Sequence, residues 1–402
     1  MARLRVPFFL LALILVPFFT FLTILWAKGY SFNLTKKKLE PRGILVATSV
    51  PDGAQVFVNG KLETATNNSL PLLPGSYSVE IKKEGFSSWK KELKIEKELV
   101  IQTNAYLFLT TPDLRPITYN GAVNPVFSPD GSKIIYSQTA SESAKTASLS
   151  LQGGVWLADL VEFLGIGRGT RQIIKPVNKG RNFTKAQFIW SPDSRQILVS
   201  LNKENFLLDP NQVTNEADLQ DISWNLPTIK AGWQGDEQRI EEAKMKRLPK
   251  QLQEILTQTA TNFDFSLDGE KLLYQATASA QIPANLTPPL PSSSTQKEER
   301  EIQPGRIYVY DLKEDKNFLI SYQLTANSSQ LKWFPTSRHL LWKEKEKISL
   351  VEYDGTNKTQ VFADSFEDNA VFPALGANKI ILLTKFGQEA NQPANLSSLN
   401  LR

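Results

Sequence analysis

The chain opens with one long apolar run and continues as short apolar stretches separated by turn residues. Residues 6–27 carry no charged side chain. A helix over this run would be about 33 Å long at about 1.5 Å per residue, enough to cross a bilayer core. The apolar core of a cleaved signal peptide is shorter, about 7–15 residues. We therefore predict an uncleaved transmembrane anchor over residues 1–29, which contacts the membrane through residues 6–27.

After a linker at residues 30–42, the pattern changes to short strands over residues 43–110. Val56-Phe57-Val58 runs into Asn59-Gly60, a strong hairpin signal because both turn residues accept a positive φ. Apolar residues at 77, 79 and 81 alternate with polar ones, which predicts a strand with one buried and one solvated face. The pattern predicts a small antiparallel β-domain.

Motifs in this stretch resemble the PEGA domain family. They occur in the order Ser49-Val50-Pro51-Asp52-Gly53-Ala54, Val56-Phe57-Val58-Asn59-Gly60, Leu73-Pro74-Gly75-x-Tyr77 and Glu84-Gly85-Phe86. Asp52 stands where the namesake tetrapeptide has Glu. The resemblance implies a small β-sandwich of surface and envelope proteins, brings no catalytic residues, and suggests association with carbohydrate or the envelope.

Beyond residue 111 the chain repeats a unit made of an aromatic residue, a tight turn and a second apolar strand. A third strand follows in each copy, at residues 155–160, 206–209, 307–312, 348–353 and 396–401. The copies read Phe127-Ser128-Pro129-Asp130-Gly131, Trp190-Ser191-Pro192-Asp193-Ser194, Phe265-Ser266-Leu267-Asp268-Gly269, Trp333-Phe334-Pro335-Thr336-Ser337 and a decayed Val371-Phe372-Pro373. This unit resembles the blades of TolB-like and WD-related propellers.

The resemblance implies a β-propeller of about five blades over residues 111–402, with a sixth possible at residues 211–233. We expect residues 114–120 to complete the last blade. Apolar spacing predicts a helical insertion at about residues 235–258, with a second short helix starting at Pro249. Residues 278–304 are rich in Pro and Ser and are expected to form an exposed loop in the third blade. The predicted fold class is thus mainly β: a transmembrane helix, a β-sandwich and a propeller with a short helical insertion.

Composition narrows the possible chemistry. The chain of 402 residues has no Cys, one His and a net charge of +5. Disulfides, thiolate sites and multi-histidine metal sites are therefore excluded. Basic and acidic residues alternate without a basic stripe, so we expect no nucleic-acid partner.

The remaining polar candidates have structural interpretations. His339 aligns with Lys133, Gln196, Lys271 and Lys379, so we expect it to be an exposed residue beside a turn, without a catalytic role. We expect Asp130, Asp193 and Asp268 to cap their turns, since one carboxylate per turn lacks the oxygens that Ca²⁺ needs. No catalytic, metal or cofactor residues are assigned, and the binding residues stay open.

We therefore predict a non-enzymatic binding or scaffold protein of the cell envelope, with residues 30–402 outside the cytoplasm and a protein or glycan partner. Arg3 and Arg5 favour a cytoplasmic N-terminus, although residues 36–38 oppose it. One alternative is a hydrolase acting on polysaccharide through two carboxylates, although Asp264 is the one acidic residue on the predicted innermost strands. The other alternative is an envelope sensor that signals through a separate partner.

Overall fold

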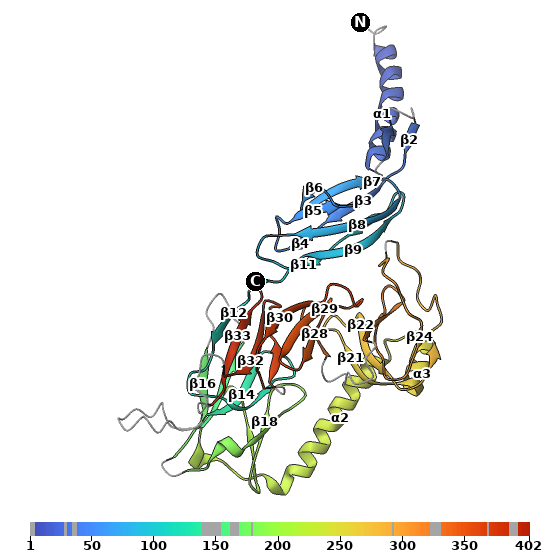
Figure 1. Ribbon diagram of the computed structural model, residues 1–402. Helices are drawn as coiled ribbons and strands as arrows, with labels where there is room; N and C mark the ends of the chain where they lie inside the picture. Colours follow the sequence, from blue (N-terminus) through green and yellow to red (C-terminus); the bar gives the residue numbers. More distant parts are fainter. Residues whose placement is uncertain are drawn as a thin grey trace. The chain divides into compact units, whose positions relative to one another are not determined.

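The computed structural model describes most of the chain and divides it into two compact units (Figure 1). The described residues are 5–27, 30–33, 38–138, 154–160, 169–177, 180–291, 293–321, 331–367, 370–385 and 393–402. The first unit contains Met1–Phe108 and Pro288–Lys297, and the second contains Leu109–Thr287 and Glu298–Arg402.

The N-terminal apolar run forms helix α1 (Arg5–Ala27), with Pro17 inside it. Across the described residues, however, no helix reaches both the length and the apolar character that a bilayer crossing requires. The prediction of a transmembrane anchor over residues 1–29 is therefore wrong.

The first unit is a β-sandwich. A four-stranded sheet in the order β6-β5-β8-β9 faces a three-stranded sheet in the order β10-β3-β7, and short pairs β11-β4 and β1-β2 complete the unit. The strands are β1 (Ser31–Asn33), β2 (Lys38–Glu40), β3 (Gly43–Ala47), β4 (Ser49–Val50), β5 (Gln55–Val58), β6 (Lys61–Ala65), β7 (Asn68–Leu72), β8 (Gly75–Lys82), β9 (Trp89–Ile95), β10 (Val100–Gln102) and β11 (Ala105–Tyr106).

Local sequence explains this sandwich. Asn59 and Gly60 take φ values of 50° and 81°, so they form the predicted hairpin turn between β5 and β6. On β8, Val79 and Ile81 are fully buried, and the residues between and beside them are not. Trp89 fills the same core, so the two sheets are held together mainly by burial of apolar surface.

In its described residues, the second unit contains five sheets of three or more strands, here called blades I to V in chain order. Blade I holds β13 (Val123–Phe127), β14 (Lys133–Gln138), β15 (Gly154–Asp159) and β16 (Thr170–Lys175), with β20 (Thr214–Asn215) at its edge. Blade II holds β17 (Gln187–Trp190), β18 (Ile197–Leu201) and β19 (Glu204–Leu208). Blade III holds β21 (Ala260–Phe265), β22 (Lys271–Ala276), β25 (Ile307–Asp311) and β26 (Lys316–Ser321). Blade IV holds β27 (Leu331–Trp333), β28 (His339–Glu344), β29 (Lys347–Glu352) and β30 (Thr359–Ala363). Blade V holds β31 (Val371–Pro373), β32 (Lys379–Thr384), β33 (Asn395–Asn400) and β12 (Asp113–Pro116).

Blade V closes the ring with strands from distant parts of the chain. β12 pairs antiparallel with β33, from Asp113 opposite Asn400 to Pro116 opposite Ser397. The side chain of Thr118 continues this contact by donating a hydrogen bond to Asn395 Oδ1 at 3.0 Å. The prediction that residues 114–120 complete the last blade is confirmed, and the five sheets form a β-propeller.

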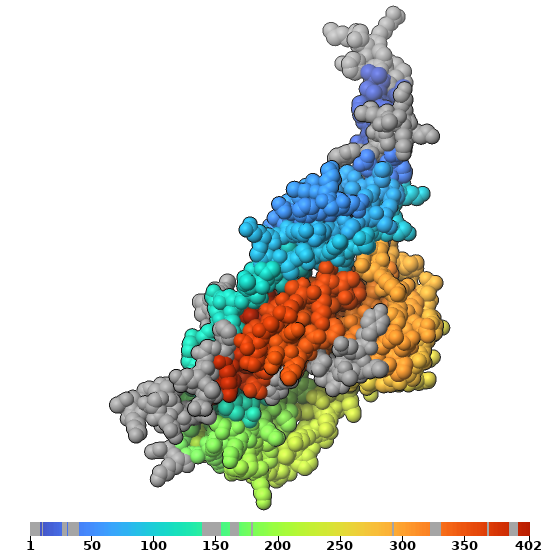
Figure 2. Space-filling view, viewed as in Figure 1, coloured from blue at the N-terminus to red at the C-terminus, as the bar shows by residue number. Residues whose placement is uncertain are grey.

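Apolar side chains fill the spaces between neighbouring blades. One buried cluster joins blades I and II, another joins blades III and IV, and a third joins blades V and I. Phe127 of blade I stacks on Phe372 of blade V with ring centroids 4.5 Å apart. Residues of blade III (orange) and blade IV (orange-red) lie side by side on the surface of this unit (Figure 2).

Helices occupy the connection between blades II and III. α2 (Leu226–Met245) and α3 (Lys250–Thr259) span the region of the predicted insertion, and α3 begins directly after Pro249 as expected. Leu252 and Leu256 of α3 are fully buried against blade III. Residues 211–233 form β20, short 3₁₀ turns and the start of α2, so the sixth blade considered there does not exist.

The Pro- and Ser-rich stretch at residues 278–304 is more ordered than its composition suggests. β23 (Ala280–Gln281) pairs with β24 (Glu301–Ile302), and Ile282 and Ile302 are fully buried in the core of blade III. The middle of the stretch, Pro288–Lys297, belongs to the first unit. There Thr295 and Gln296 donate hydrogen bonds to the carbonyl oxygen of Glu92 at 3.0 and 2.8 Å. The expectation of an exposed loop is wrong for the buried Ile282 and Ile302, whereas Thr295 is exposed as expected.

Candidate functional site: the inner cavity of the propeller

The first strand of each blade lies at the inner edge of its sheet. First strands of neighbouring blades are in contact, β13 with β17 and β21 with β27. Trp190 Nε1 donates a hydrogen bond to the carbonyl oxygen of Val126 at 3.2 Å. Trp333 Nε1 donates to the carbonyl oxygen of Asp264 at 2.9 Å. Because a buried indole N–H needs an acceptor, each Trp fixes its blade to the preceding one.

The turn that follows each first strand is built by a Ser and an Asp side chain. In blade I, Ser128 Oγ donates to Asp130 Oδ1 at 2.6 Å and accepts the N–H of Lys133 at 2.9 Å. Asp130 Oδ1 also accepts the N–H of Ser132 at 2.9 Å. Burial works to raise the pKa of Asp130, but hydrogen bonds from Ser128 and Ser132 outweigh it and hold the pKa below its usual value.

Blades II and III repeat this turn. Ser191 Oγ donates to Asp193 Oδ1 at 2.6 Å, and this hydrogen bond is the main reason that the pKa of Asp193 is lowered. Ser266 Oγ donates to Asp268 Oδ1 at 2.5 Å. These carboxylates bind their own turns, as the sequence predicted. In the described part of the chain, no group of three His, Asp or Glu residues could hold a metal ion.

A second serine joins the turns of adjacent blades. Ser194 Oγ of blade II accepts the N–H of Asp130 of blade I at 3.0 Å. Ser337 Oγ of blade IV accepts the N–H of Asp268 of blade III at 3.1 Å. Both serines have positive φ values, 60° and 55°. The turns of blades I and II, and those of blades III and IV, are therefore joined in pairs.

A cavity of about 570 Å³ lies where these turns and the ends of the first strands meet. Its lining is mostly proline, aromatic and aliphatic, with one lysine and one aspartate. The lining residues are Pro125, Val126, Phe127, Ser128, Pro129, Asp130, Gly131, Leu267, Lys332, Trp333, Pro335, Phe372, Pro373 and Leu375. We call this the inner cavity. Leu267 and Leu375 are 63% and 38% exposed, so apolar surface is available to a ligand there.

Lys332 supplies the positive charge of the inner cavity. Its Nζ lies 5.0 Å from the ring centroid of Phe372, a cation–π contact between blades IV and V. Desolvation and the nearby charge of Lys343 lower the pKa of Lys332, whereas Asp264 opposes this. Desolvation raises the pKa of Asp264, against the charges of Lys244 and Lys332 and the backbone N–H of Trp333. The side chain of Lys332 thus lies against the ring of Phe372, and Asp264 is the acidic group that acts on its charge.

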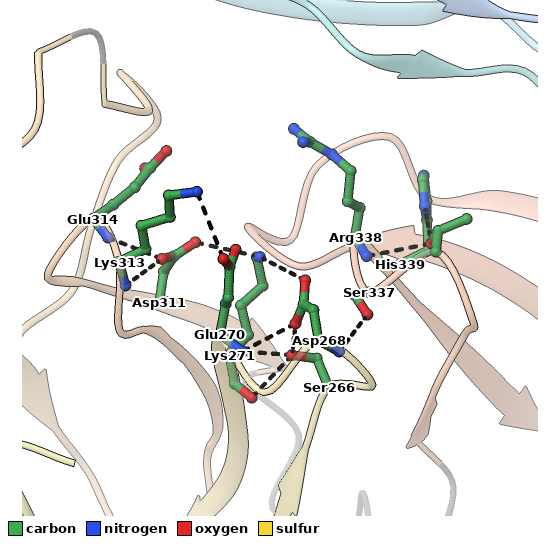
Figure 3. A network of polar contacts seen from close by, with 11 residues as sticks. Ser266, Asp268, Glu270, Lys271, Asp311, Lys313, Glu314, Ser337, Arg338 and His339 are labelled. Atoms are coloured by element: carbon green, nitrogen blue, oxygen red, sulfur yellow. Dashed lines mark hydrogen bonds and ion pairs between the residues drawn. The ribbon is translucent and has the colours of Figure 1, made fainter. Parts of the chain in front are cut away.

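A buried polar network lies near the turns of blades III and IV (Figure 3). Lys271 Nζ lies 3.7 Å from Asp311 Oδ2 and 4.0 Å from Asp268 Oδ2, and 4.9 Å from the ring centroid of Tyr353. Asp311 Oδ1 in turn accepts the N–H of Lys313 at 3.0 Å. The side chains of Lys271 and Asp311 are only 8% and 4% exposed, so the charges compensate each other. This arrangement is structural, because its polar atoms point to one another.

His339 belongs to the same region and contradicts the expectation of exposure. It is 2% exposed, and its Nδ1 lies 3.0 Å from Thr336 Oγ1. Lys271, its counterpart in blade III, is also buried. Tyr353 of blade IV covers Lys271, whereas His339 contacts Thr336 of its own turn, and an alignment of the repeats within one chain reveals neither contact. His339 does not line the inner cavity.

Acidic residues are few on the described first strands and in the described lining of the inner cavity. Among the described first-strand residues, Asp264 is the only carboxylate, as the sequence indicated. Within the described lining of the inner cavity, Asp130 is the only acidic residue, and its turn already uses it. Sequence reasoning missed Lys332, although its position as the one charged residue of β27 was readable. It also missed the inter-blade hydrogen bonds of the tryptophans.

The fold and its cavity place the chain among proteins that combine a β-sandwich with a β-propeller. Residues 42–109 match the family model described as PEGA domain, so the chain carries a PEGA domain before its propeller. No curated protein matches.

Solved structures with some similarity include two TolB proteins. A putative TolB from Agrobacterium tumefaciens is 12% identical with a TM-score of 0.20, and the match covers 67% of this chain and 76% of that one. TolB from Acinetobacter baumannii is 11% identical with a TM-score of 0.23, and the match covers 81% of this chain and 59% of that one. Because these identities and TM-scores are low, the assignment of a propeller depends on the five sheets and on the pairing of β12 with β33.

Proposed function

We propose that this chain is a non-catalytic binding protein associated with the cell envelope outside the cytoplasm, and that the inner cavity holds a segment of a partner protein. The carrying observation is the combination of an apolar lining with the single ammonium of Lys332. Apolar pockets with a few placed polar groups are the usual form of a ligand site. The PEGA domain supports the envelope location, because the family occurs in surface and envelope proteins.

The chemistry of the lining defines the segment. Leu267, Leu375 and Phe372 favour an apolar or aromatic side chain, which loses contact with water on binding. Lys332 favours a carboxylate beside that side chain, from Asp, Glu or a chain terminus. The ligand class is therefore a short peptide segment in which an apolar residue neighbours an acidic group.

The test is selection of a random heptapeptide library displayed on phage against the full chain. We expect enriched peptides to pair apolar and acidic residues, and to bind Lys332→Glu at least tenfold more weakly. Lys203→Glu is the matched control, because it makes the same charge change at an exposed turn outside the inner cavity.

Equal binding to the wild-type chain and Lys332→Glu would refute the assignment of the site. A panel of polysaccharides incubated with the same preparation addresses catalysis. If the wild-type chain releases shorter products and Asp264→Asn does not, the protein is a hydrolase and the proposed binding function is wrong.

A further inference from the structure

Blade II lacks the outer strand that the other blades have. Blades III, IV and V each have four strands and blade I has five, whereas blade II ends at β19. Residues 180–291 are described without a gap, so the missing strand is a property of the fold there. The segment after β19 instead supplies β20, which pairs in parallel with β16 of blade I.

The outer edge of β19 is occupied only at one residue. The N–H of Asn205 donates to Asp221 Oδ1 at 3.0 Å, and its carbonyl oxygen accepts the N–H of Ile222 at 2.8 Å. Backbone groups of alternate residues in an antiparallel strand point to the same side. The N–H and C=O of Leu207 therefore also point away from β18, and in the described part of the chain no hydrogen bond reaches them.

A cavity of about 700 Å³ lies along this edge. It is bounded on one side by β19 and on the other by the segment that crosses to blade I and returns. The lining residues are Asp193, Arg195, Gln196, Phe206, Leu207, Leu208, Asp209, Gln212, Thr214, Asp218, Leu219, Gln220 and Ile222. None of them lines the inner cavity. We call this site the blade II groove.

We propose that the blade II groove binds an extended, basic peptide segment of a partner protein as the fourth strand of blade II. The free N–H and C=O of Leu207 would pair with the backbone of the segment. An open strand edge is a template for such pairing, and adding a strand to an edge is an established mode of peptide recognition.

The side chains around the groove specify the segment further. Its lining has three carboxylates, from Asp193, Asp209 and Asp218, against one guanidinium, from Arg195. This excess of negative charge favours Lys or Arg in the partner. Leu219 and Ile222 on the flanking segment line the groove and are half-buried, so they offer apolar contacts to alternate side chains of an added strand.

The experiment uses the full chain carrying Lys332→Glu. Binding of peptides at the inner cavity is thereby weakened, so the result is independent of the function proposed for that cavity. The probe is a synthetic hexapeptide library with Lys at positions 1 and 5, Thr at position 3, and Val, Ile, Leu, Phe or Tyr at the other positions. Binding is measured by fluorescence anisotropy. Leu207→Pro removes the outward N–H, and Leu207→Ala is the matched control that shortens the side chain and keeps the N–H.

We expect library members to bind the Leu207→Ala protein at least tenfold more tightly than the Leu207→Pro protein. We also expect Asp209→Lys to weaken binding severalfold. The proposal is overturned if no member distinguishes the two Leu207 variants. If Leu207→Pro fails to fold, as judged by circular dichroism, the test is repeated with the Leu207→Ala protein and peptides in which every second amide is N-methylated. If neither of the two alternate sets of N-methylated amides weakens binding, strand addition is excluded.

Discussion

The hydrogen bonds beside the ring closure allow a sharp test of how blade V holds the propeller together. Thr118 Oγ1 donates to Asn395 Oδ1 at 3.0 Å and accepts the N–H of Leu396 at 3.0 Å. Asn395 Oδ1 also accepts the N–H of Gly121 at 2.8 Å. Thr118 is 4% exposed and Leu396 is fully buried. The perturbation is Thr118→Val, which keeps the shape of the side chain and removes the hydroxyl.

The expected loss of stability depends on which polar groups are left without a hydrogen bond in Thr118→Val. Asn395 Oδ1 keeps the hydrogen bond from Gly121, but among the described residues the buried N–H of Leu396 donates only to Thr118. An unsatisfied buried donor costs about 1–3 kcal/mol. We therefore expect Thr118→Val to lower the free energy of unfolding by about 2 kcal/mol. For a domain of this size, that corresponds to a fall in Tm of roughly 4 °C.

The assay is urea unfolding of the full chain, followed by tryptophan fluorescence. All tryptophans except Trp26 and Trp89 lie in the propeller unit, so the signal reports mainly on it. Thr118→Ser keeps the hydroxyl and controls for the lost methyl group. Thr261→Val makes the same change as Thr118→Val at an exposed position of β21. If the unfolding free energies of Thr118→Val and Thr118→Ser differ by less than about 0.5 kcal/mol, the hydroxyl does not stabilise the closure and the reasoning fails.

Three further predictions concern the same unit. Asp311→Asn leaves the buried ammonium of Lys271 poorly compensated and should cost about 3 kcal/mol in urea unfolding; adding Lys271→Met should recover at least half, and no recovery would contradict the pairing. The pKa of Asp130 lies below its ordinary value of 3.8 in the folded state, so its contribution to stability is complete above that pH and is lost as pH falls through the folded-state pKa. Asp130→Asn should therefore flatten the fall in unfolding free energy below about pH 4, measured by urea titrations at several pH values, whereas an unchanged slope would exclude the turn carboxylate as its cause. Deleting residues 114–120 should lower the Tm far more than deleting an exposed loop segment of equal length, and equal effects would argue against closure by β12.

Much of the architecture was readable from the repeat. The aromatic residue and the tight turn mark the first two strands of each blade, because turn chemistry and apolar alternation are local properties. The third strands were also predicted close to their observed bounds, for example residues 307–312 for β25 (Ile307–Asp311). The fourth strands were not predicted, since β16, with its sequence TRQIIK, has a polar first half.

The features that sequence reasoning missed depend on contacts between blades. His339 is an exception: it was predicted to be exposed but is 2% exposed, and its Nδ1 lies 3.0 Å from Thr336 Oγ1 of its own turn. The hydrogen bond from Trp333 to Asp264 joins residues 69 positions apart, and no local pattern encodes it. The inner cavity and the blade II groove likewise arise where separate segments meet, so only their individual residues were visible beforehand.

The pairing of β12 with β33 also determines when the protein can finish folding during its synthesis. Thr118 and Asn395 are 277 positions apart. At about 5–20 residues per second, β12 leaves the ribosome tens of seconds before its partner strand exists. Throughout that interval, a nascent chain carries an unsatisfied edge at its first propeller strand. A chain that ends before β33 lacks the partner strand of β12, so it cannot close blade V as the full chain does.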